Sequence, residues 1–124
     1  MQGKTVLIAE DELEIRELLA LLLETEGYTV LKASDGQEAL DFVNDRRIVV
    51  DLLITDLGLP KLGGLELIQH ARRLSPSVKI IASSGFGHAN VRDELRKAGV
   101  VQFFPKPFSP MQMLESAKRL LTDQ

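Results

Sequence analysis

Five short apolar runs alternate with five segments of helical character along this 124-residue chain, and this alternation constrains its fold most strongly. The runs are short and partly β-branched, as is typical of buried strands. We expect strands at residues 5–9, 28–33, 49–55, 78–82 and 100–104. The third run is almost entirely apolar apart from Asp51, which is typical of a parallel strand covered on both faces. The sequence therefore predicts an α/β fold, a doubly wound five-stranded parallel sheet with helices on both faces.

The expected helices are marked by apolar spacing and by residues that begin or end them. The first has one apolar face, formed by Ile15, Leu18, Leu19, Leu22 and Leu23. Gly27 is placed to end it, because glycine adopts a left-handed conformation without steric cost. Asp35 lies in a turn with capping chemistry before a second helix, and further helices are expected at residues 65–74 and 89–98. Ser109 as N-cap and Pro110 at the first helical position predict the start of the last helix.

Composition limits the functions that the chain can have. A length of 124 residues suits a single domain, here residues 1–124, and 44% hydrophobic with 27% charged residues argues against disorder. The net charge of -3 argues against direct nucleic-acid binding, which needs a basic face. The most apolar stretch, residues 18–23, is too short to insert across a membrane. The absence of cysteine excludes disulfides and thiolate metal sites, so a cytoplasmic protein is expected.

Polar residues follow four of the five apolar runs at the point where each run ends. Glu10 and Asp11 follow the first, Asp56 the third, Ser84 the fourth and Lys106 the fifth. In open parallel sheets, ligands bind outside the carboxyl ends of the strands. The three carboxylates, the hydroxyl and the ammonium are therefore expected to converge on one site.

This set of side chains suits a hard cation and a phosphoryl group. Mg²⁺, or Mn²⁺, prefers oxygen ligands such as the carboxylates of Asp11 and Asp56. Glu10 could ligate directly or through a water, and the Gly58 backbone carbonyl could complete the set. A carboxylate can also act as a nucleophile and form an aspartyl phosphate, whose charge Lys106 would offset. Since no general base accompanies these groups, the pattern predicts acceptance of a phosphoryl group without efficient turnover.

Four motifs in this order resemble the receiver domain of two-component response regulators, the CheY-like family, over nearly the whole chain. They are Glu10-Asp11, residues 56–60, Ser84-Gly85 and residues 106–108. None is specific alone, but all four at these spacings are highly specific. The resemblance implies a flavodoxin-like sheet with strand order 2-1-3-4-5. The chain also looks similar to receivers attached to hybrid sensor kinases.

The resemblance implies a role for each site residue. Asp56 would take the phosphoryl group from a histidine of a sensor kinase or a histidine phosphotransfer protein. Ser84 and Lys106 would sense it, and Phe103 occupies the position of the switch aromatic. The fourth helix, fifth strand and fifth helix would then present a changed face to a downstream protein that the sequence does not identify. The Lys106-Pro107 bond is expected to be cis.

Several positions depart from the commonest pattern of the family. Glu10 replaces an aspartate, and Phe103 lacks the hydroxyl of the usual tyrosine. Gly58 and Phe86 flank the site and offer no acid or amide that could position a hydrolytic water, so spontaneous dephosphorylation is expected to be slow. A strand phenylalanine can also be ordinary core, and Phe104 should take the opposite face, so one of the two should be less buried.

Three other functions compete with phosphoryl acceptance. A hydrolase that uses an aspartyl phosphate usually has a second aspartate where Gly58 stands, which disfavours that alternative. A nucleotide-binding protein of similar topology would carry a glycine-rich phosphate motif after the first strand, and none is present. An interaction domain that works without phosphorylation is the third alternative, and the intact acidic set argues against it.

Overall fold

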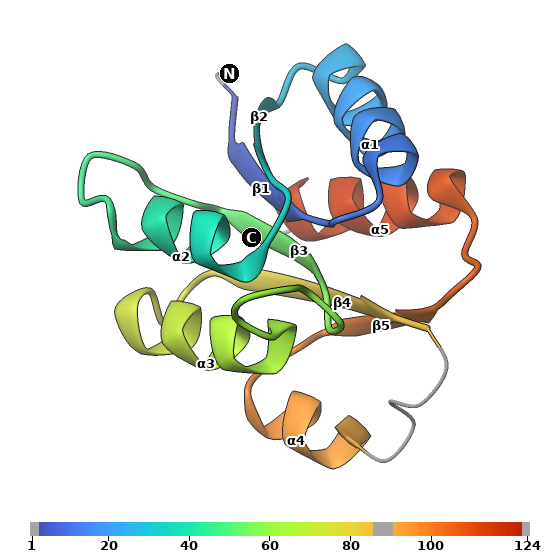
Figure 1. Cartoon of the computed structure of the whole chain (residues 1–124). Helices are drawn as coiled ribbons and strands as arrows, with labels where there is room; N and C mark the ends of the chain where they lie inside the picture. The colour runs from blue at the N-terminus through green and yellow to red at the C-terminus, as the bar shows by residue number, and fades with distance from the viewer. Residues whose placement is uncertain (1–2, 86–90, 123–124) are drawn as a thin grey trace.

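The computed structural model describes residues 3–85 and 91–122 (Figure 1). Within these residues five strands form one parallel sheet in the order β2-β1-β3-β4-β5. The strands are β1 (Thr5–Ala9), β2 (Thr29–Ala33), β3 (Leu52–Asp56), β4 (Lys79–Ser84) and β5 (Gln102–Pro105). The predicted α/β class and the strand order are both confirmed.

Helices cover both faces of the sheet, as Figure 1 shows: α1 and α5 lie on one side, and α2, α3 and α4 on the other. Their bounds are α1 (Leu13–Thr25), α2 (Gly36–Asn44), α3 (Gly64–Leu74), α4 (Arg92–Lys97) and α5 (Pro110–Thr122). Within the described part of the chain, no helix is both long enough and apolar enough to cross a membrane.

Each face of the sheet has its own hydrophobic core, because side chains alternate along a strand. In β1, Val6 and Ile8 join the core under α1 and α5, whereas Leu7 joins the core under α2, α3 and α4. In β3, Leu53 faces the α2–α3 side. The sheet is thereby buried on both faces, which explains the nearly continuous apolar runs in its strands.

The helix ends agree with the capping residues that the sequence predicted. The Asp35 side chain accepts a hydrogen bond from the Glu38 N–H (2.8 Å) at the start of α2. At the start of α5 the Ser109 hydroxyl accepts one from the Gln112 N–H (3.2 Å). Gly27 and Gly99 adopt φ values of 97° and 85° just beyond α1 and α4, where a side chain would be strained. The first residues of the helix expected at 89–98 lie outside the described residues, and α4 begins at Arg92.

Two expectations about individual residues are wrong. Leu18 is 42% exposed, because the buried stripe of α1 runs through Leu19, Ala20 and Leu23 instead. The third strand begins at Leu52 rather than at residue 49, since its pairing with β1 starts from the Val6–Leu52 register. Residues 45–51 form the connection to β3.

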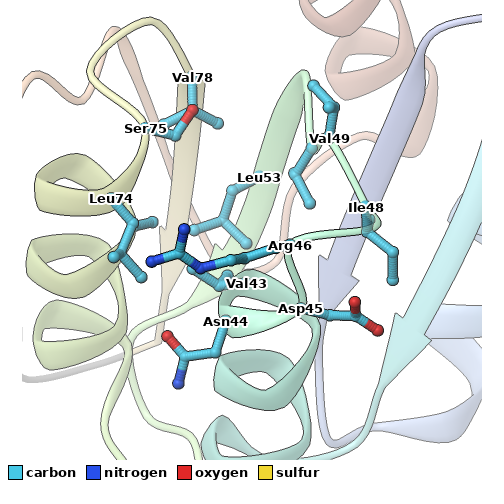
Figure 2. A pocket seen from close by; sticks show the side chains of 12 residues that line it. Val43, Asn44, Asp45, Arg46, Ile48, Val49, Leu53, Leu74, Ser75 and Val78 are labelled. Atoms are coloured by element: carbon cyan, nitrogen blue, oxygen red, sulfur yellow. The ribbon is translucent and has the colours of Figure 1, made fainter.

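The exposed residue Val49, 72% accessible, borders a hollow at the amino-terminal edge of the sheet. This hollow has a volume of about 320 Å³ and lies between the ends of α2 and α3 (Figure 2). Leu53 lies at its floor, and Leu74 and Arg46 lie along its sides. The carboxyl ends of the strands, where the polar site residues were expected, lie at the other edge.

Candidate functional site

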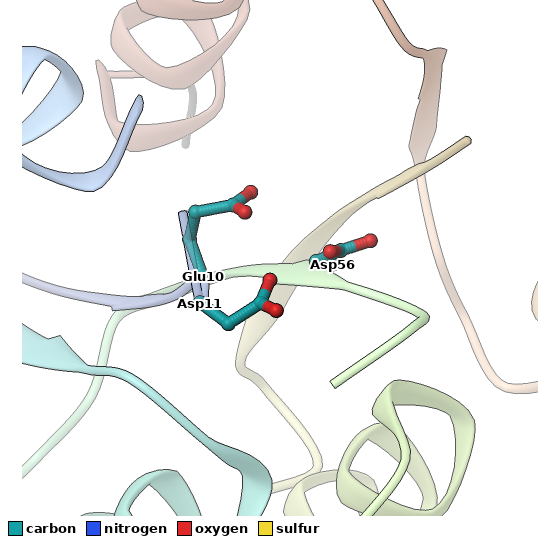
Figure 3. Close-up of side chains that lie close together, drawn as sticks. All are labelled: Glu10, Asp11 and Asp56. Atoms are coloured by element: carbon teal, nitrogen blue, oxygen red, sulfur yellow. The ribbon is translucent and has the colours of Figure 1, made fainter. Parts of the chain in front are cut away.

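The three carboxylates predicted from the sequence meet at the carboxyl ends of β1 and β3. Glu10 and Asp11 directly follow β1, and Asp56 is the last residue of β3 (Figure 3). One oxygen from each lies within 4.8 Å of the others. Glu10 and Asp56 are only 2% and 7% exposed, whereas Asp11 is exposed. The cluster is therefore anchored in the sheet edge and opens to solvent at Asp11.

Lys106 joins the carboxylates from the far side of β4. Its Nζ donates hydrogen bonds to Glu10 Oε2 (3.0 Å) and Asp56 Oδ2 (3.2 Å), and it lies 3.6 Å from Glu12 Oε2. The Lys106 N–H donates to the carbonyl of Ser84 (2.7 Å), which fixes the start of the lysine stem against the end of β4. The Lys106-Pro107 bond is cis, as the resemblance implied.

The pKa values of Glu10 and Lys106 are both raised, but for different reasons. Burial raises the pKa of the Glu10 carboxyl, and hydrogen bonds from Lys106 and the Glu12 N–H offset only part of this effect. Burial lowers the pKa of Lys106, but its hydrogen bond to Glu10 and the charges of Asp56 and Glu10 outweigh burial, so that pKa is raised. Lys106 is therefore charged at neutral pH, whereas the ionised form of Glu10 is disfavoured by folding.

The raised pKa of Glu10 predicts a specific dependence of stability on pH. The contribution of Glu10 to the free energy of unfolding is fully present below the ordinary pKa of 4.5. It is lost as the pH rises through the higher pKa of the folded state. In EDTA, the native chain should therefore lose stability relative to Glu10→Gln as the pH rises above about 4.5. The free energy of unfolding of Glu10→Gln minus that of the native chain should increase with pH over this range. Urea denaturation at several pH values measures the difference, with Glu14→Gln as a control that removes an exposed carboxylate. A difference that stays constant with pH would contradict this expectation.

Gly58 lies beside Asp56, and Ser84 is the last residue of the neighbouring strand β4, one residue past the Asp56–Ser83 pair. Ser84 is completely buried at the end of β4, and its hydroxyl donates to the Gly85 carbonyl (3.1 Å). The Gly58 N–H donates to Asp56 Oδ1 (3.2 Å), so both Asp56 oxygens accept hydrogen bonds. The sensing role of Ser84 and the ligand role of the Gly58 carbonyl stay predictions. Phe86 lies outside the described residues.

The two phenylalanines of β5 lie on opposite faces of the sheet. Phe103 packs with the core under α2, α3 and α4, and Phe104 packs with the core under α1 and α5. Both are half-buried, and the expectation that one is less buried than the other stays a prediction. The guanidinium of Arg92 lies 4.8 Å from the centre of the Phe103 ring, while Phe104 meets Phe108 at a ring distance of 6.1 Å. Each ring thus has its own neighbour on its own face.

Sequence reasoning missed three residues that shape the site. The Glu12 N–H donates to Glu10 Oε2 (3.1 Å), and Arg16 Nη1 donates to the Glu10 carbonyl (2.9 Å). A Cβ on Gly64 would lie 2.2 Å from the Asp56 carbonyl oxygen. The position of Glu12 and Arg16 at the start of a helix directly after Glu10-Asp11 was a usable signal, and so was the Gly63-Gly64 pair after Asp56.

The donor atoms fit a divalent cation of the magnesium class. The side chains that could ligate it offer only carboxylate oxygens, and two of the three are buried against a sheet edge that holds their positions. Hard cations select such oxygen donors, whereas zinc sites usually include histidine or cysteine. The acidic cluster found among the described residues therefore matches the predicted cation chemistry.

Comparison with known proteins agrees with this geometry. The family model of the response regulator receiver domain matches residues 6–118. The chain is similar to the phosphate regulon transcriptional regulatory protein PhoB of Pseudomonas aeruginosa, with 35% identity over 98% of this chain and 53% of the relative. It is also similar to the sensor kinase CckA of Brucella abortus, with 33% identity over 97% of this chain and 13% of the relative.

A solved structure of a CheY-like receiver domain protein from Methanospirillum hungatei superimposes with a TM-score of 0.89 and 30% identity, covering 97% of this chain and 94% of that one. The chain spans about half the length of PhoB and about an eighth of the length of CckA. The family match, the strand order and the acidic cluster agree with one another. The chain belongs to the response regulator receiver domain family of two-component signalling systems.

Proposed function

We propose that Asp56 accepts a phosphoryl group from a phosphohistidine of a sensor kinase or a histidine phosphotransfer protein, in a reaction that depends on Mg²⁺. The contact between Asp56 Oδ2 and Lys106 Nζ, 3.2 Å long and beside Glu10 and Asp11, carries this proposal. It supports the proposal because a carboxylate, a lysine ammonium and two further carboxylates lie within one small volume.

Asp56 is the best nucleophile of the three carboxylates. Glu10 is nearly inaccessible, and its Oε2 is held by both Lys106 and the Glu12 N–H. Asp11 is exposed and makes no ion pair with Lys106 among the described residues. Asp56 combines a position at the end of β3 with direct contact to the lysine, so it can be oriented and its product charge can be neutralised.

In the proposed reaction an Asp56 carboxylate oxygen forms a bond to phosphorus while the phosphorus–nitrogen bond of the phosphohistidine breaks. The electrons of that bond return to the imidazole nitrogen of the donor. Lys106 offsets the negative charge on the transferred group, and Ser84 would donate a hydrogen bond to it. Asp11, Asp56 and the Gly58 carbonyl would hold Mg²⁺, with Glu10 nearby, and the ion supplies further positive charge against the phosphoryl oxygens.

The output of this reaction would be a change at the face formed by α4, β5 and α5. Phe103 and Ser84 are proposed to move together when the phosphoryl group arrives, which alters the surface presented to a downstream protein. Beyond its own phosphorylation and slow dephosphorylation the domain would catalyse no reaction. Because the proposed reaction needs a phosphotransfer partner of this kind, we propose that it takes place in the cytoplasm.

Intact mass after incubation with acetyl phosphate tests the proposal. With Mg²⁺ we expect a gain of one phosphoryl group, about 80 Da, that disappears in EDTA and in Asp56→Asn. Asp51→Asn is the matched control, because Asp51 lies just before the same strand and accepts a hydrogen bond from the Thr5 N–H at the opposite edge. Equal labelling of the native chain and Asp56→Asn would reject Asp56 as the acceptor. If the native chain stays unlabelled, the same test with a phosphohistidine donor decides the matter.

A further inference from the structure

One end of α4 is fastened to α3 by a single arginine. Arg72, near the end of α3, donates from Nε to the Ala98 carbonyl (3.0 Å) and from Nη2 to the Gly99 carbonyl (3.3 Å). Its Nη1 donates to the Pro76 carbonyl (2.6 Å). Ala98 is the C-cap of α4, so its carbonyl belongs to the orphan groups that every helix end leaves unsatisfied, and Gly99 directly follows it. The carboxyl end of α4 is therefore tied to the neighbouring helix through main-chain atoms.

The other end of α4 is held in a different way. Arg92, the first residue of α4, places its guanidinium 4.8 Å from the centre of the Phe103 ring in β5. A guanidinium over an aromatic face is attracted by the negative charge of that face. Phe103 has no hydroxyl, so its ring face is what it can offer to a polar partner. This contact joins the amino end of α4 to the residue proposed as the switch aromatic.

We propose that the Arg92–Phe103 contact is a latch that holds α4 and Phe103 in the resting arrangement. This inference rests on the proposed function, since the latch acts on the response to phosphorylation at Asp56. The hydrogen bonds of Arg72 keep the carboxyl end of α4 in place, and the latch controls whether the amino end can move. Arg92 is a positioning residue in this scheme and does not contact the phosphoryl site.

The direction of the effect follows from the state in which the contact is made. A movement of the Phe103 ring away from Arg92 must break it, so the contact favours the resting state alone. A contact made in only one of two states shifts the equilibrium toward that state by the free energy of the contact. A guanidinium–ring contact at an exposed site corresponds to about a two- to fivefold change in an equilibrium. Removing it should raise the population of the responsive state by about that factor.

The initial rate of Mg²⁺-dependent phosphorylation by acetyl phosphate, followed by intact mass, tests the latch. Arg92→Ala should react about two- to fivefold faster than the native chain. Arg96→Ala is the matched control: it removes the same charge from the same helix, where Arg96 pairs with Asp93 (2.7 Å) instead of a ring. In a Phe103→Leu background, Arg92→Ala should have no further effect. Equal rates for Arg92→Ala and Arg96→Ala, or an effect that persists without the ring, would overturn the latch.

Urea denaturation of the same single and double variants gives a second test that needs no phosphorylation. The Arg92–Phe103 cycle should show a coupling that corresponds to about a two- to fivefold change in the folding equilibrium. A coupling of zero would overturn the latch even if Asp56 is phosphorylated. Failure of the native chain to take up a phosphoryl group from any donor would instead count against the proposed function, and the coupling would then report on the contact alone.

Discussion

Gly64→Ala is expected to lower the free energy of unfolding by about 3 kcal/mol, because the new methyl group would collide with backbone atoms. A Cβ at this position would lie 2.2 Å from the Asp56 carbonyl oxygen and 2.6 Å from the Leu57 Cα. Neither atom can turn aside as a side chain would, since both belong to the end of β3 and the residue after it. The strand end that carries Asp56 would have to move, so the proposed phosphorylation of Asp56 should slow as well.

Gly63→Ala provides a matched control one residue earlier. A Cβ there would meet only the Leu57 carbonyl oxygen, at an ordinary distance of 3.9 Å. The expected loss is under about 1 kcal/mol, the cost of alanine at the N-cap of α3. Urea denaturation of both variants measures the difference. Similar losses for the two would show that the contact between Gly64 and the Asp56 backbone does not limit stability.

Lys106→Met is expected to slow the proposed Mg²⁺-dependent phosphorylation of Asp56 by about 100-fold. Methionine keeps an unbranched stem of similar shape but removes the charge that contacts both Glu10 (3.0 Å) and Asp56 (3.2 Å). The transferred phosphoryl group would then lose its fixed positive partner at the moment when negative charge gathers at Asp56. The initial rate with acetyl phosphate, measured by intact mass, gives the factor.

Mg²⁺ binding and a control variant separate a loss of reactivity from a loss of folding in Lys106→Met. The variant should bind Mg²⁺ at least as tightly as the native chain, because removal of the lysine frees the same carboxylates for the cation. Lys32→Met is the control, since it breaks an exposed lysine–carboxylate pair of equal length (Lys32–Glu17, 3.0 Å) between β2 and α1. A rate for Lys106→Met within twofold of the native rate would mean that Lys106 takes no part in the reaction.

Much of the fold could be predicted because its determinants are local. The apolar run that ends at Ala9, the capping residue Asp35 and the Ser109-Pro110 pair each act within a few residues of their own position. The errors came where a distant element decides the outcome. Leu18 fits the apolar spacing of α1, but the placement of α1 against β1 and α5 buries Ala20 and leaves Leu18 at the surface. Val49 has a strand-forming side chain but precedes the point where β1 begins to pair with β3.

The site shows the same division between local and distant causes. Glu10, Asp56 and Lys106 could be placed together because parallel strands bring their carboxyl ends to one edge. The contact of Arg92 with the Phe103 ring depends on how α4 packs against the sheet. No spacing within the sequence encodes that contact, so it emerged only from the three-dimensional arrangement.

The separation of the acidic site from the hollow at the other edge of the sheet has a practical consequence for spectroscopy. The natural chain contains no cysteine, so a single introduced thiol would be the sole attachment point for a fluorophore or spin label. Val49 is 72% exposed in the connection before β3, with the full length of that strand between it and Asp56. A reporter attached there would observe the amino-terminal edge while leaving the proposed phosphoryl site untouched.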